Sequence, residues 1–265
     1  MPYAVTTTNL LDLRIRPAHD AERASQLFFG EPVQVLSRRR EFVRVRQVDG
    51  YWGWADHRFL ANIGRGEFTD WTTQVNAVIS SGRASVYADK NGRPAPPYFL
   101  LYGTQVRAVR VRDGFSALLL PGGAKVYVRS AHLRSINKIS AKKLTGDRLL
   151  TEAKKFLGVP YLWGGVSPLG FDCSGLVRTL FGAFGHRLPR DTSRQIKVGR
   201  KVDRNSIRTG DLLFFKRHVG LAIGRTRLLH ASRGGGGVRI NSLNPGEPDY
   251  RKDLDRDFNQ ARRLL

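Results

Sequence analysis

The sequence predicts a multidomain protein in which two small all-β domains are followed by an α+β domain. Three observations predict this fold class. The first half of the chain repeats itself at a constant offset of 73 residues, and the hydrophobic spacing changes from strand-like to helical near residue 148. The length of 265 residues, with 41% hydrophobic content, suffices for two or three cores. The predicted domains are residues 1–66 and 67–137, a linker over 138–147, and a third domain over 148–265.

Each copy of the repeat reads as short strands separated by glycine-containing turns. Two segments align between the copies, residues 29–35 with 102–108 and residues 54–60 with 127–133. Hydrophobic residues alternate over 42–45 and resume at residue 51, after a turn at Asp49 and Gly50. Short strands at such close spacing indicate small β-barrels.

Three segments of the first copy carry a resemblance to a known family: Leu13-Arg14-Ile15-Arg16-Pro17, Phe29-Gly30-Glu31 and Gly53-Trp54-Ala55. They resemble bacterial SH3-like domains, over residues 8–62 and more weakly over 73–136. The resemblance implies modules that bind cell-wall peptides or shape an adjacent active site. Because Trp54 lies in the strand pattern and recurs as Tyr127, we expect it in the core.

After residue 148 the spacing of hydrophobic residues becomes helical. Residues 149–157 read as a helix that ends at Gly158, and residues 173–184 as a second helix. Three strand-like segments follow, over 212–215, 218–223 and 228–232. Helices followed by a meander of antiparallel strands predict an α+β domain.

The chain has 45 Lys and Arg against 22 Asp and Glu, a formal net charge of +23. Such a charge suggests nucleic-acid binding, but no recognition helix, zinc ligands or glycine-aromatic motif accompanies it. We therefore expect no nucleic-acid partner. A dispersed basic surface favours solubility and attracts small anions.

Several classes of protein are excluded by what the sequence lacks. One cysteine excludes an internal disulfide framework and a multi-cysteine zinc site, and no apolar run is long enough for a membrane-spanning helix. The first residues show no basic region followed by an apolar stretch, so no signal peptide is visible. We expect a cytoplasmic monomer, with a secreted or envelope protein as the alternative location.

Cys173 is placed at the first turn of a predicted helix, after Gly170-Phe171-Asp172. Free backbone N–H groups and the helix dipole favour a thiolate at such a position and supply donors for an oxyanion. These features suit a nucleophile. The alternative is a buried, inert cysteine.

His218 and His230 flank a predicted hairpin with a turn near residues 224–226. Because strand side chains alternate between faces, a loop with an odd number of residues puts both imidazoles on one face. A three-residue turn would make them diagonal neighbours, and a two-residue turn would separate them. One histidine could then act as base toward Cys173 while the other orients it. Two structural histidines are the alternative.

Six motifs follow one another in the third domain: Pro160-Tyr161-Leu162-Trp163-Gly164-Gly165, Phe171-Asp172-Cys173-Ser174-Gly175-Leu176-Val177, Leu188-Pro189-Arg190-Asp191-Thr192-Ser193-Arg194-Gln195, Gly210-Asp211-Leu212-Leu213-Phe214-Phe215, His218-Val219-Gly220 and His230-Ala231-Ser232. They resemble the NlpC-type cysteine peptidases of bacteria. The resemblance implies a papain-like fold and cleavage of amide bonds next to D-glutamate or diaminopimelate in peptidoglycan peptides.

Carried over by matching position, the resemblance makes Cys173 the nucleophile and His218 the general base. His230 is then the residue that orients His218, and Tyr161 donates to the oxyanion beside the Cys173 N–H. We expect no metal ion and no cofactor, because one cysteine and two histidines lack a further convincing ligand.

Two SH3-like domains ahead of such a peptidase resemble one branch, the γ-D-glutamyl-L-diamino-acid endopeptidases of the dipeptidyl-peptidase VI type. That branch requires a free N-terminal L-alanine, and its first module holds the substrate amine. Tyr51 and Glu22 are the candidates for this role. Asp172 and Ser174 resemble the branch's contacts to the same end, although Asp172 also suits a helix N-cap.

Trp163 and Arg190 complete the candidate substrate-binding residues. Trp163 lies in the same motif as Tyr161. The planar guanidinium of Arg190 is suited to a substrate carboxylate.

The resemblance implies that the Cys173 thiolate attacks the γ-glutamyl carbonyl and that protonated His218 protonates the leaving amine. Expected substrates are murein peptides such as L-Ala-γ-D-Glu-diaminopimelate, or the lysine equivalent, in cell-wall peptide recycling. The first alternative is a secreted DL-endopeptidase that acts on intact wall and uses its SH3-like domains as wall-binding modules. The second is a non-catalytic wall-binding or nucleic-acid-binding protein, which the complete set of candidate catalytic residues disfavours.

Overall fold

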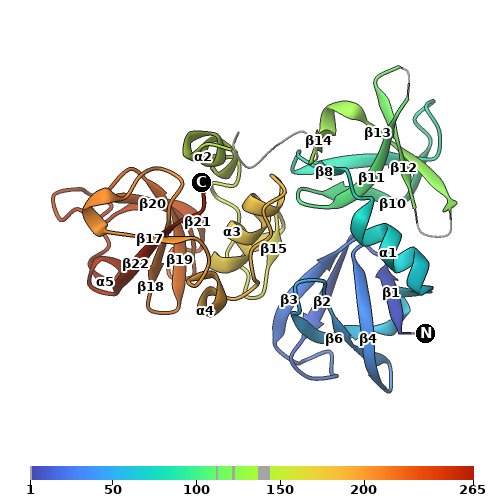
Figure 1. Ribbon diagram of the computed structural model, residues 1–265, viewed down its shortest axis with the longest axis horizontal. Helices are drawn as coiled ribbons and strands as arrows, with labels where there is room; N and C mark the ends of the chain where they lie inside the picture. Colours follow the sequence, from blue (N-terminus) through green and yellow to red (C-terminus); the bar gives the residue numbers. More distant parts are fainter. Residues whose placement is uncertain (1, 112, 121–122, 137–143) are drawn as a thin grey trace. The chain divides into compact units, whose positions relative to one another are not determined.

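The computed structural model of the chain describes residues 2–111, 113–120, 123–136 and 144–265. Two compact units, Met1–Lys138 and Ile139–Leu265, divide the chain and are described separately (Figure 1). Strands dominate both units, and the helices are short. Residues 138–143 of the predicted linker lie outside the described residues.

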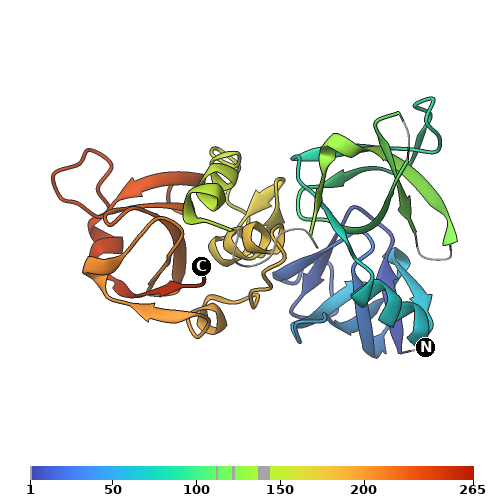
Figure 2. The same cartoon turned by 45° about the horizontal axis from the view of Figure 1, so that its top comes forward.

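The described part of the first unit contains two seven-stranded antiparallel sheets with corresponding strand orders. The first is drawn in blue and cyan and the second in green in Figures 1 and 2. The first has the order β3-β2-β6-β5-β4-β1-β7, and the second has the order β10-β9-β13-β12-β11-β8-β14. The strands of the first sheet are β1 Tyr3–Thr6, β2 Leu10–Arg14, β3 Arg23–Phe28, β4 Pro32–Arg39, β5 Phe42–Arg46, β6 Trp52–Asp56 and β7 Leu60–Ile63. Those of the second are β8 Ala77–Ile79, β9 Arg83–Tyr87, β10 Pro94–Leu101, β11 Gln105–Arg110, β12 Phe115–Leu119, β13 Lys125–Arg129 and β14 Leu133–Ser135.

The repeat in the sequence is also a repeat of these strands. Strands β9, β11, β12 and β13 begin 73 residues after β2, β4, β5 and β6, respectively. The short 3₁₀ helices η1 (His57–Phe59) and η3 (Ser130–His132) are related by the same offset. The two copies therefore share one order of elements as well as one sequence pattern.

Alternation along β6 decides which of its side chains reach the core of the first sheet. Gly53 and Ala55 are buried, whereas Trp52 is exposed and Trp54 is only half-buried. The prediction of Trp54 as a core residue is therefore wrong, because the period of two puts it on the same face as Trp52. Ala55 instead joins the hydrophobic cluster of this sheet.

A helix that the strand pattern does not predict follows the first sheet. Helix α1, Arg65–Thr73, packs on β1 and β4, with Trp71 buried and the Phe68 ring stacked on Tyr3 at 4.3 Å between centroids. The predicted boundary between residues 66 and 67 therefore lies inside α1.

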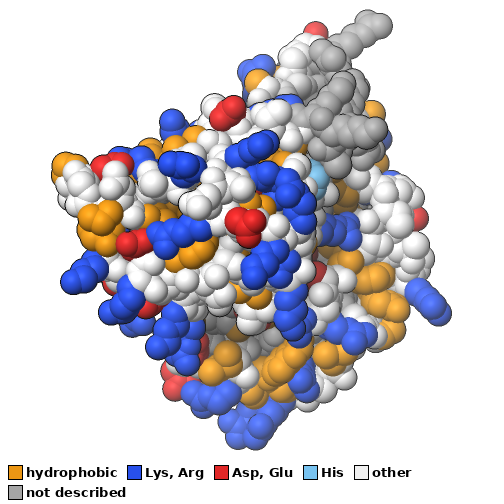
Figure 3. Space-filling view, turned by 60° about the vertical axis from the view of Figure 1, so that its left-hand side comes forward, with side chains coloured by type: hydrophobic (Ala, Val, Ile, Leu, Met, Phe, Trp, Pro, Cys, Tyr) orange, Lys and Arg blue, Asp and Glu red, His pale blue; other side chains and the backbone are white. Residues whose placement is uncertain are grey.

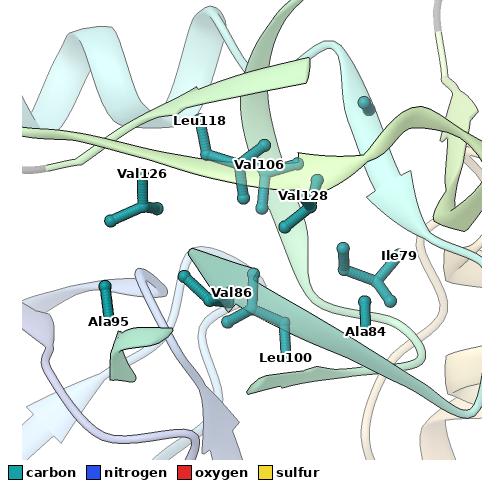
Figure 4. Close-up of a cluster of buried hydrophobic side chains, with 10 residues drawn as sticks. Ile79, Ala84, Val86, Ala95, Leu100, Val106, Leu118, Val126 and Val128 are labelled. Carbon is teal, nitrogen blue, oxygen red and sulfur yellow. The ribbon is translucent and has the colours of Figure 1, made fainter. Parts of the chain in front are cut away.

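The second sheet surrounds its own cluster of aliphatic side chains, which Figure 4 shows from several strands. Val86 and Leu100 come from β9 and β10, and Leu118 and Val128 from β12 and β13. Phe29, which follows β3 of the first sheet, packs against this cluster. The two sheets of the first unit thus share an apolar contact.

The second unit joins helices to a six-stranded antiparallel sheet with the order β17-β22-β18-β19-β20-β21. Its strands are β17 Arg200–Val202, β18 Leu212–Phe215, β19 His218–Ile223, β20 Arg227–Ser232, β21 Gly237–Ser242 and β22 Phe258–Arg263, with a separate pair β15 Val166–Ser167 and β16 Gly170–Phe171. Its helices are α2 Gly146–Lys154, α3 Cys173–Gly182, α4 Thr192–Gln195 and α5 Lys252–Arg256, with the 3₁₀ helix η5 Arg204–Ser206.

Helix α2 begins inside the predicted linker. The Thr145 hydroxyl accepts a hydrogen bond from the Arg148 N–H, which is the geometry of an N-cap. Leu144 is buried just before it. The helix therefore starts at Gly146, three residues before the first residue that hydrophobic spacing assigned to it.

The hairpin of β19 and β20 determines where the two candidate histidines lie. Ile223 pairs with Arg227, so the connecting loop has three residues, Gly224, Arg225 and Thr226. This is the odd-numbered turn that places His218 and His230 on one face as diagonal neighbours. Helix α3, which begins at Cys173, packs on the same two strands.

Two properties of the surface bear on partners. Lys and Arg side chains are scattered over the face in Figure 3 and do not form one continuous stripe. Among the described residues, no helix is long and apolar enough to cross a membrane.

Candidate active site

Cys173 is the first residue of α3, and its side chain is nearly buried, with 8% of the residue exposed. The Asp172 carboxylate caps the helix by accepting a hydrogen bond of 2.7 Å from the Gly175 N–H. Three donors are directed at the sulfur: the N–H groups of Ser174 and Val219, and the hydroxyl of Thr192. Since Val219 directly follows His218, the first residues of β19 lie at the thiol.

The burial of the Cys173 thiol opposes the influence of the helix N-terminus, which favours a thiolate. Burial raises the pKa of Cys173 to about 11, and the Asp172 carboxylate adds to the rise. The three donors oppose it but do not overcome it. The helix position predicts a lowering of the thiol pKa, whereas burial, which raises it, determines the direction of the net shift.

Asp172 and Arg190 form an ion pair beneath the first turn of α3. Arg190 is 2% exposed and donates to both carboxylate oxygens of Asp172, at 3.1 and 2.5 Å, and to Ser174 Oγ at 2.8 Å. Asp172 Oδ2 also accepts a hydrogen bond from the Gly164 N–H at 3.0 Å. The prediction of Arg190 as a ligand for substrate carboxylates is corrected here, because its guanidinium is engaged inside the protein.

His218 and His230 are in direct contact, as the three-residue turn predicts. His218 Nε2 lies 2.7 Å from His230 Nδ1, and the two rings are nearly perpendicular at 4.9 Å between centroids. Burial lowers the pKa of His218 to about 3 and that of His230 to about 4. Arg251 lowers both further. Both imidazoles are therefore neutral at physiological pH.

Gly220 lies between the two histidines in the hairpin and packs closely on β20. By the register of the hairpin it lies opposite His230, between His218 and Ala222 on the same face. A Cβ atom at this position would lie 2.7 Å from Leu228 Cδ1 and 3.1 Å from His230 Cβ. A side chain at this position would therefore crowd His230 and displace the Leu228 methyl group.

Asn241 on β21 is a polar neighbour of the pair that the motifs did not reveal. Its Oδ1 lies 3.0 Å from His230 Nε2, and its Nδ2 donates to the Asp249 carbonyl at 3.0 Å. The number of residues in the β20–β21 loop decides whether Asn241 lies on the same face as His230. Four consecutive glycines, 234–237, prevent that number from being predicted from the sequence.

Tyr161 lies close enough to Cys173 for the two to interact electrostatically. Burial raises the pKa of Tyr161 to about 12, and Cys173 and Asp172 contribute to the rise. Its backbone N–H donates to the Gly236 carbonyl at 2.9 Å, which holds the residue beside β21. The phenol therefore keeps its proton and is available as a hydrogen-bond donor.

The remaining candidates lie in different environments. Trp163, two residues after Tyr161, is 54% exposed, and Ser174 is buried. Tyr51 and Glu22 belong to the first unit: Glu22 is exposed, and Tyr51 packs against the core and donates to the Ala24 carbonyl at 3.3 Å. The second unit thus brings together Tyr161, Asp172, Cys173, Ser174, Arg190, His218 and His230.

These residues form a set suited to acyl transfer. A thiol lies at a helix N-terminus with a neutral phenol nearby, and two neutral imidazoles in contact follow at β19 and β20. A neutral imidazole can accept the thiol proton during attack, and the helix N–H and phenol O–H can stabilise an oxyanion. Within the described ranges, no group of three or more His, Cys, Asp or Glu is arranged to hold a metal ion.

Comparison with known proteins finds one matching protein family in each unit. Residues 158–254 match the NlpC/P60 family, and residues 13–58 match the bacterial dipeptidyl-peptidase SH3 domain. The γ-D-glutamyl-L-lysine dipeptidyl-peptidase of Bacillus subtilis is 30% identical over 259 residues, which cover 92% of this chain and 83% of that protein.

Of two further relatives, one covers nearly the whole chain and the other covers less than half of it. A crystal structure of an NlpC/P60 family protein from Bacillus cereus superimposes with a TM-score of 0.85 and 25% identity, and covers 99% of both chains. The murein DD-endopeptidase/murein LD-carboxypeptidase of Escherichia coli is 42% identical over 125 residues, 45% of this chain and 63% of that protein.

Proposed function

The chain belongs to the NlpC/P60 family of cysteine peptidases, and from this premise we propose that it hydrolyses the γ-D-glutamyl-L-diamino acid bond of murein peptides. The observation that carries the proposal is the alignment with the Bacillus subtilis dipeptidyl-peptidase, which runs through both units. The match of residues 13–58 to the SH3 domain of bacterial dipeptidyl-peptidases supports it.

The proposed reaction begins with the neutral pair of thiol and imidazole. As Cys173 Sγ bonds to the γ-glutamyl carbonyl carbon, His218 takes the thiol proton, and the oxyanion accepts hydrogen bonds from the Cys173 N–H and Tyr161 O–H. The C–N bond then breaks, and His218 passes its proton to the leaving amine. Water, deprotonated by His218, attacks the thioester and releases the carboxylic acid and the thiol.

For the fold, we propose that both sheets of the first unit are SH3-like barrels and that the second unit is an α+β papain-like domain. The common order of strands in the two sheets supports the first part. Helix α3 packed on β19 and β20 supports the second. The proposed first domain extends to Thr73, because α1 packs on its sheet.

We propose that the substrate has a free N-terminal L-alanine and that the enzyme releases a dipeptide. Tyr51 and Glu22 are the proposed partners of the ammonium, with Asp172, Ser174 and Trp163 as further contacts. Both Tyr51 and Glu22 lie within residues 13–58, which match the SH3 domain of bacterial dipeptidyl-peptidases. Such substrates are the free peptides of wall recycling, which suits a cytoplasmic monomer.

A second candidate function is hydrolysis of peptides still attached to the wall. The observation that favours it is the higher identity, 42% over 125 residues, to the Escherichia coli murein DD-endopeptidase/LD-carboxypeptidase. In that case the first unit would serve as a wall-binding module.

Incubation with defined peptides distinguishes these functions. L-Ala-γ-D-Glu-diaminopimelate and L-Ala-γ-D-Glu-L-Lys, each with and without an N-acetyl group, and purified sacculi are offered to the enzyme, and products are identified by mass spectrometry. We expect L-Ala-D-Glu from free-amine peptides, little from acetylated ones, and no product with Cys173→Ala. Cleavage of sacculi or acetylated peptides at equal rates would reject the requirement for a free amine, and turnover by Cys173→Ala would reject the mechanism.

A further inference from the structure

Three polar side chains form a row across three neighbouring strands. His218 on β19, His230 on β20 and Asn241 on β21 are each the diagonal neighbour of the next, because His230 pairs with Arg239 and β19–β20 pairing places His230 opposite Gly220. Diagonal neighbours are about 7–8 Å apart, within reach of long side chains. The two contacts along the row measure 2.7 and 3.0 Å.

The backbone determines which way Asn241 faces. Its Nδ2 can only donate, and it lies 3.0 Å from the Asp249 carbonyl oxygen, which can only accept. Its Oδ1 is therefore the atom that faces His230 Nε2. Because Asn241 is 4% exposed and His230 1% exposed, bulk water does not compete for these contacts.

This orientation sets the proton positions along the row. An amide oxygen can only accept, so His230 Nε2 carries a proton, and His230 Nδ1 of the neutral ring is left as an acceptor. His218 Nε2 must then carry a proton to donate to His230 Nδ1. His218 Nδ1 keeps its lone pair, which is the form that a general base requires.

We propose that Asn241 is a positioning residue for catalysis: held by the Asp249 carbonyl, it fixes the tautomer of His230 and, through it, the tautomer that makes His218 a base. In the opposite tautomer, His218 would present an N–H to the thiol and could not accept its proton. When His218 becomes an imidazolium, its Nε2–H still donates to His230. The row therefore serves both protonation states without turning any side chain.

The neutral amide also matters for the charge of the pair. The charged groups that act on the histidines are Arg239 on β21 and Arg251, both of which lower the pKa of His230, and Asp253 on α5, which raises it. A carboxylate in place of the Asn241 amide would favour the imidazolium forms. The asparagine gives orientation without adding this negative charge.

Nitrogen-15 NMR of the histidine rings in the free enzyme tests the proposal directly. We expect protons on Nε2 of both His218 and His230 in the wild type. Asn241→Leu, which keeps the branching at Cγ but loses the acceptor, should give a mixture of tautomers, while Asn241→Asp, which keeps an acceptor toward His230 Nε2, should keep the wild-type pattern. A wild-type His218 protonated on Nδ1, or an Asn241→Leu variant with unchanged tautomers, would overturn the proposal.

Steady-state kinetics on L-Ala-γ-D-Glu-L-Lys provide the second measurement. Asn241→Leu should lower kcat by about 10- to 100-fold with little change in KM. Asn241→Asp should retain more of kcat and move the acidic limb of the pH profile to higher pH. Wild-type kcat in Asn241→Leu would refute the positioning role.

Ser242→Ala is the matched control, since Ser242 is the next residue of β21 and its hydroxyl hydrogen-bonds with the Thr226 carbonyl and the Asn244 N–H. We expect wild-type tautomers and wild-type kcat from this variant. If it loses as much kcat as Asn241→Leu, the effect of Asn241→Leu comes from a general disturbance of β21, and the positioning role is rejected. The kinetic readout rests on the proposed function, whereas the NMR readout does not. If the enzyme does not cleave this peptide, the proposed function is wrong, but the NMR result still tests the role of Asn241.

Discussion

At the scale of single residues, Cys173 is subject to two opposing influences. The N-terminus of α3 and three donors favour its thiolate, but burial and the Asp172 carboxylate favour the thiol and raise its pKa to about 11. The imidazoles of His218 and His230 are kept neutral by the same desolvation. The resting site therefore holds a thiol and a neutral base, and the proton moves when substrate is attacked.

The first prediction concerns alkylation of Cys173 by iodoacetamide. Because the thiolate reacts and its pKa is about 11, the rate should rise about tenfold per pH unit from pH 7 to 9 without a plateau. Mass spectrometry of the intact protein follows the reaction. As the chain has one cysteine, all labelling reports this residue. A plateau below pH 8 would instead demonstrate a preformed ion pair of thiolate and imidazolium.

At the scale of elements, the start of α3 is held in place from the motif around Arg190. Arg190 binds both Asp172 and Ser174, and Gln195 Nε2 donates to the Ser174 carbonyl at 3.0 Å. These contacts attach the first turn of the helix to the segment that ends in α4. The motif that suggested a substrate ligand therefore orders the turn that carries the nucleophile.

The second prediction follows from this attachment. Arg190→Ala leaves the Asp172 carboxylate buried without its cation, so the free energy of unfolding of the second unit should fall by about 3–5 kcal/mol. Denaturant unfolding measures the loss. Arg194→Ala, an exposed arginine in the same motif, should change it by less than about 0.5 kcal/mol. Unchanged stability with a raised KM would restore the role of Arg190 as a substrate ligand.

At the scale of the whole molecule, burial of ionisable groups links stability to pH. The folded-state pKa values of His218 and His230 are below the ordinary value of 6.5, so below pH 6.5 the unfolded chain binds protons that the folded chain does not. Their contribution to stability is complete above pH 6.5 and is lost as pH falls toward about 4 and about 3. Asp56 and Asp253, whose pKa values are below 3.8, lose theirs in a lower range.

The third prediction is a fall in stability between pH 6.5 and 4.5. Each buried histidine should contribute about 1.4 kcal/mol per pH unit in this range. Hydrogen exchange of the α3 amides at several pH values reports the free energy of opening of the second unit. The double variant His218→Gln/His230→Gln should show a weaker dependence in this window. A wild-type curve that is flat from pH 6.5 to 4.5 would contradict the buried neutral pair.

Local patterns in the sequence determined the strands β18 and β19 and the start of α3, because these features follow from side-chain alternation and helix spacing. The sequence left open whether His218 and His230 share a face, and the three-residue loop of the structure decided that they do. The motifs also identified the peptidase family and the residues that the second unit brings together.

Only the tertiary structure decided the protonation of Cys173, the partner of Arg190 and the role of Asn241. The pKa of a thiol depends on how much solvent the whole fold removes, and this quantity has no local signature. Arg190 is 18 residues from Asp172 in the sequence but pairs with it in the fold. Asn241 is oriented by the carbonyl of Asp249, a residue that follows β21 and lies beside it. Residue types therefore named the reacting groups, whereas burial and long-range hydrogen bonds determined where their protons lie.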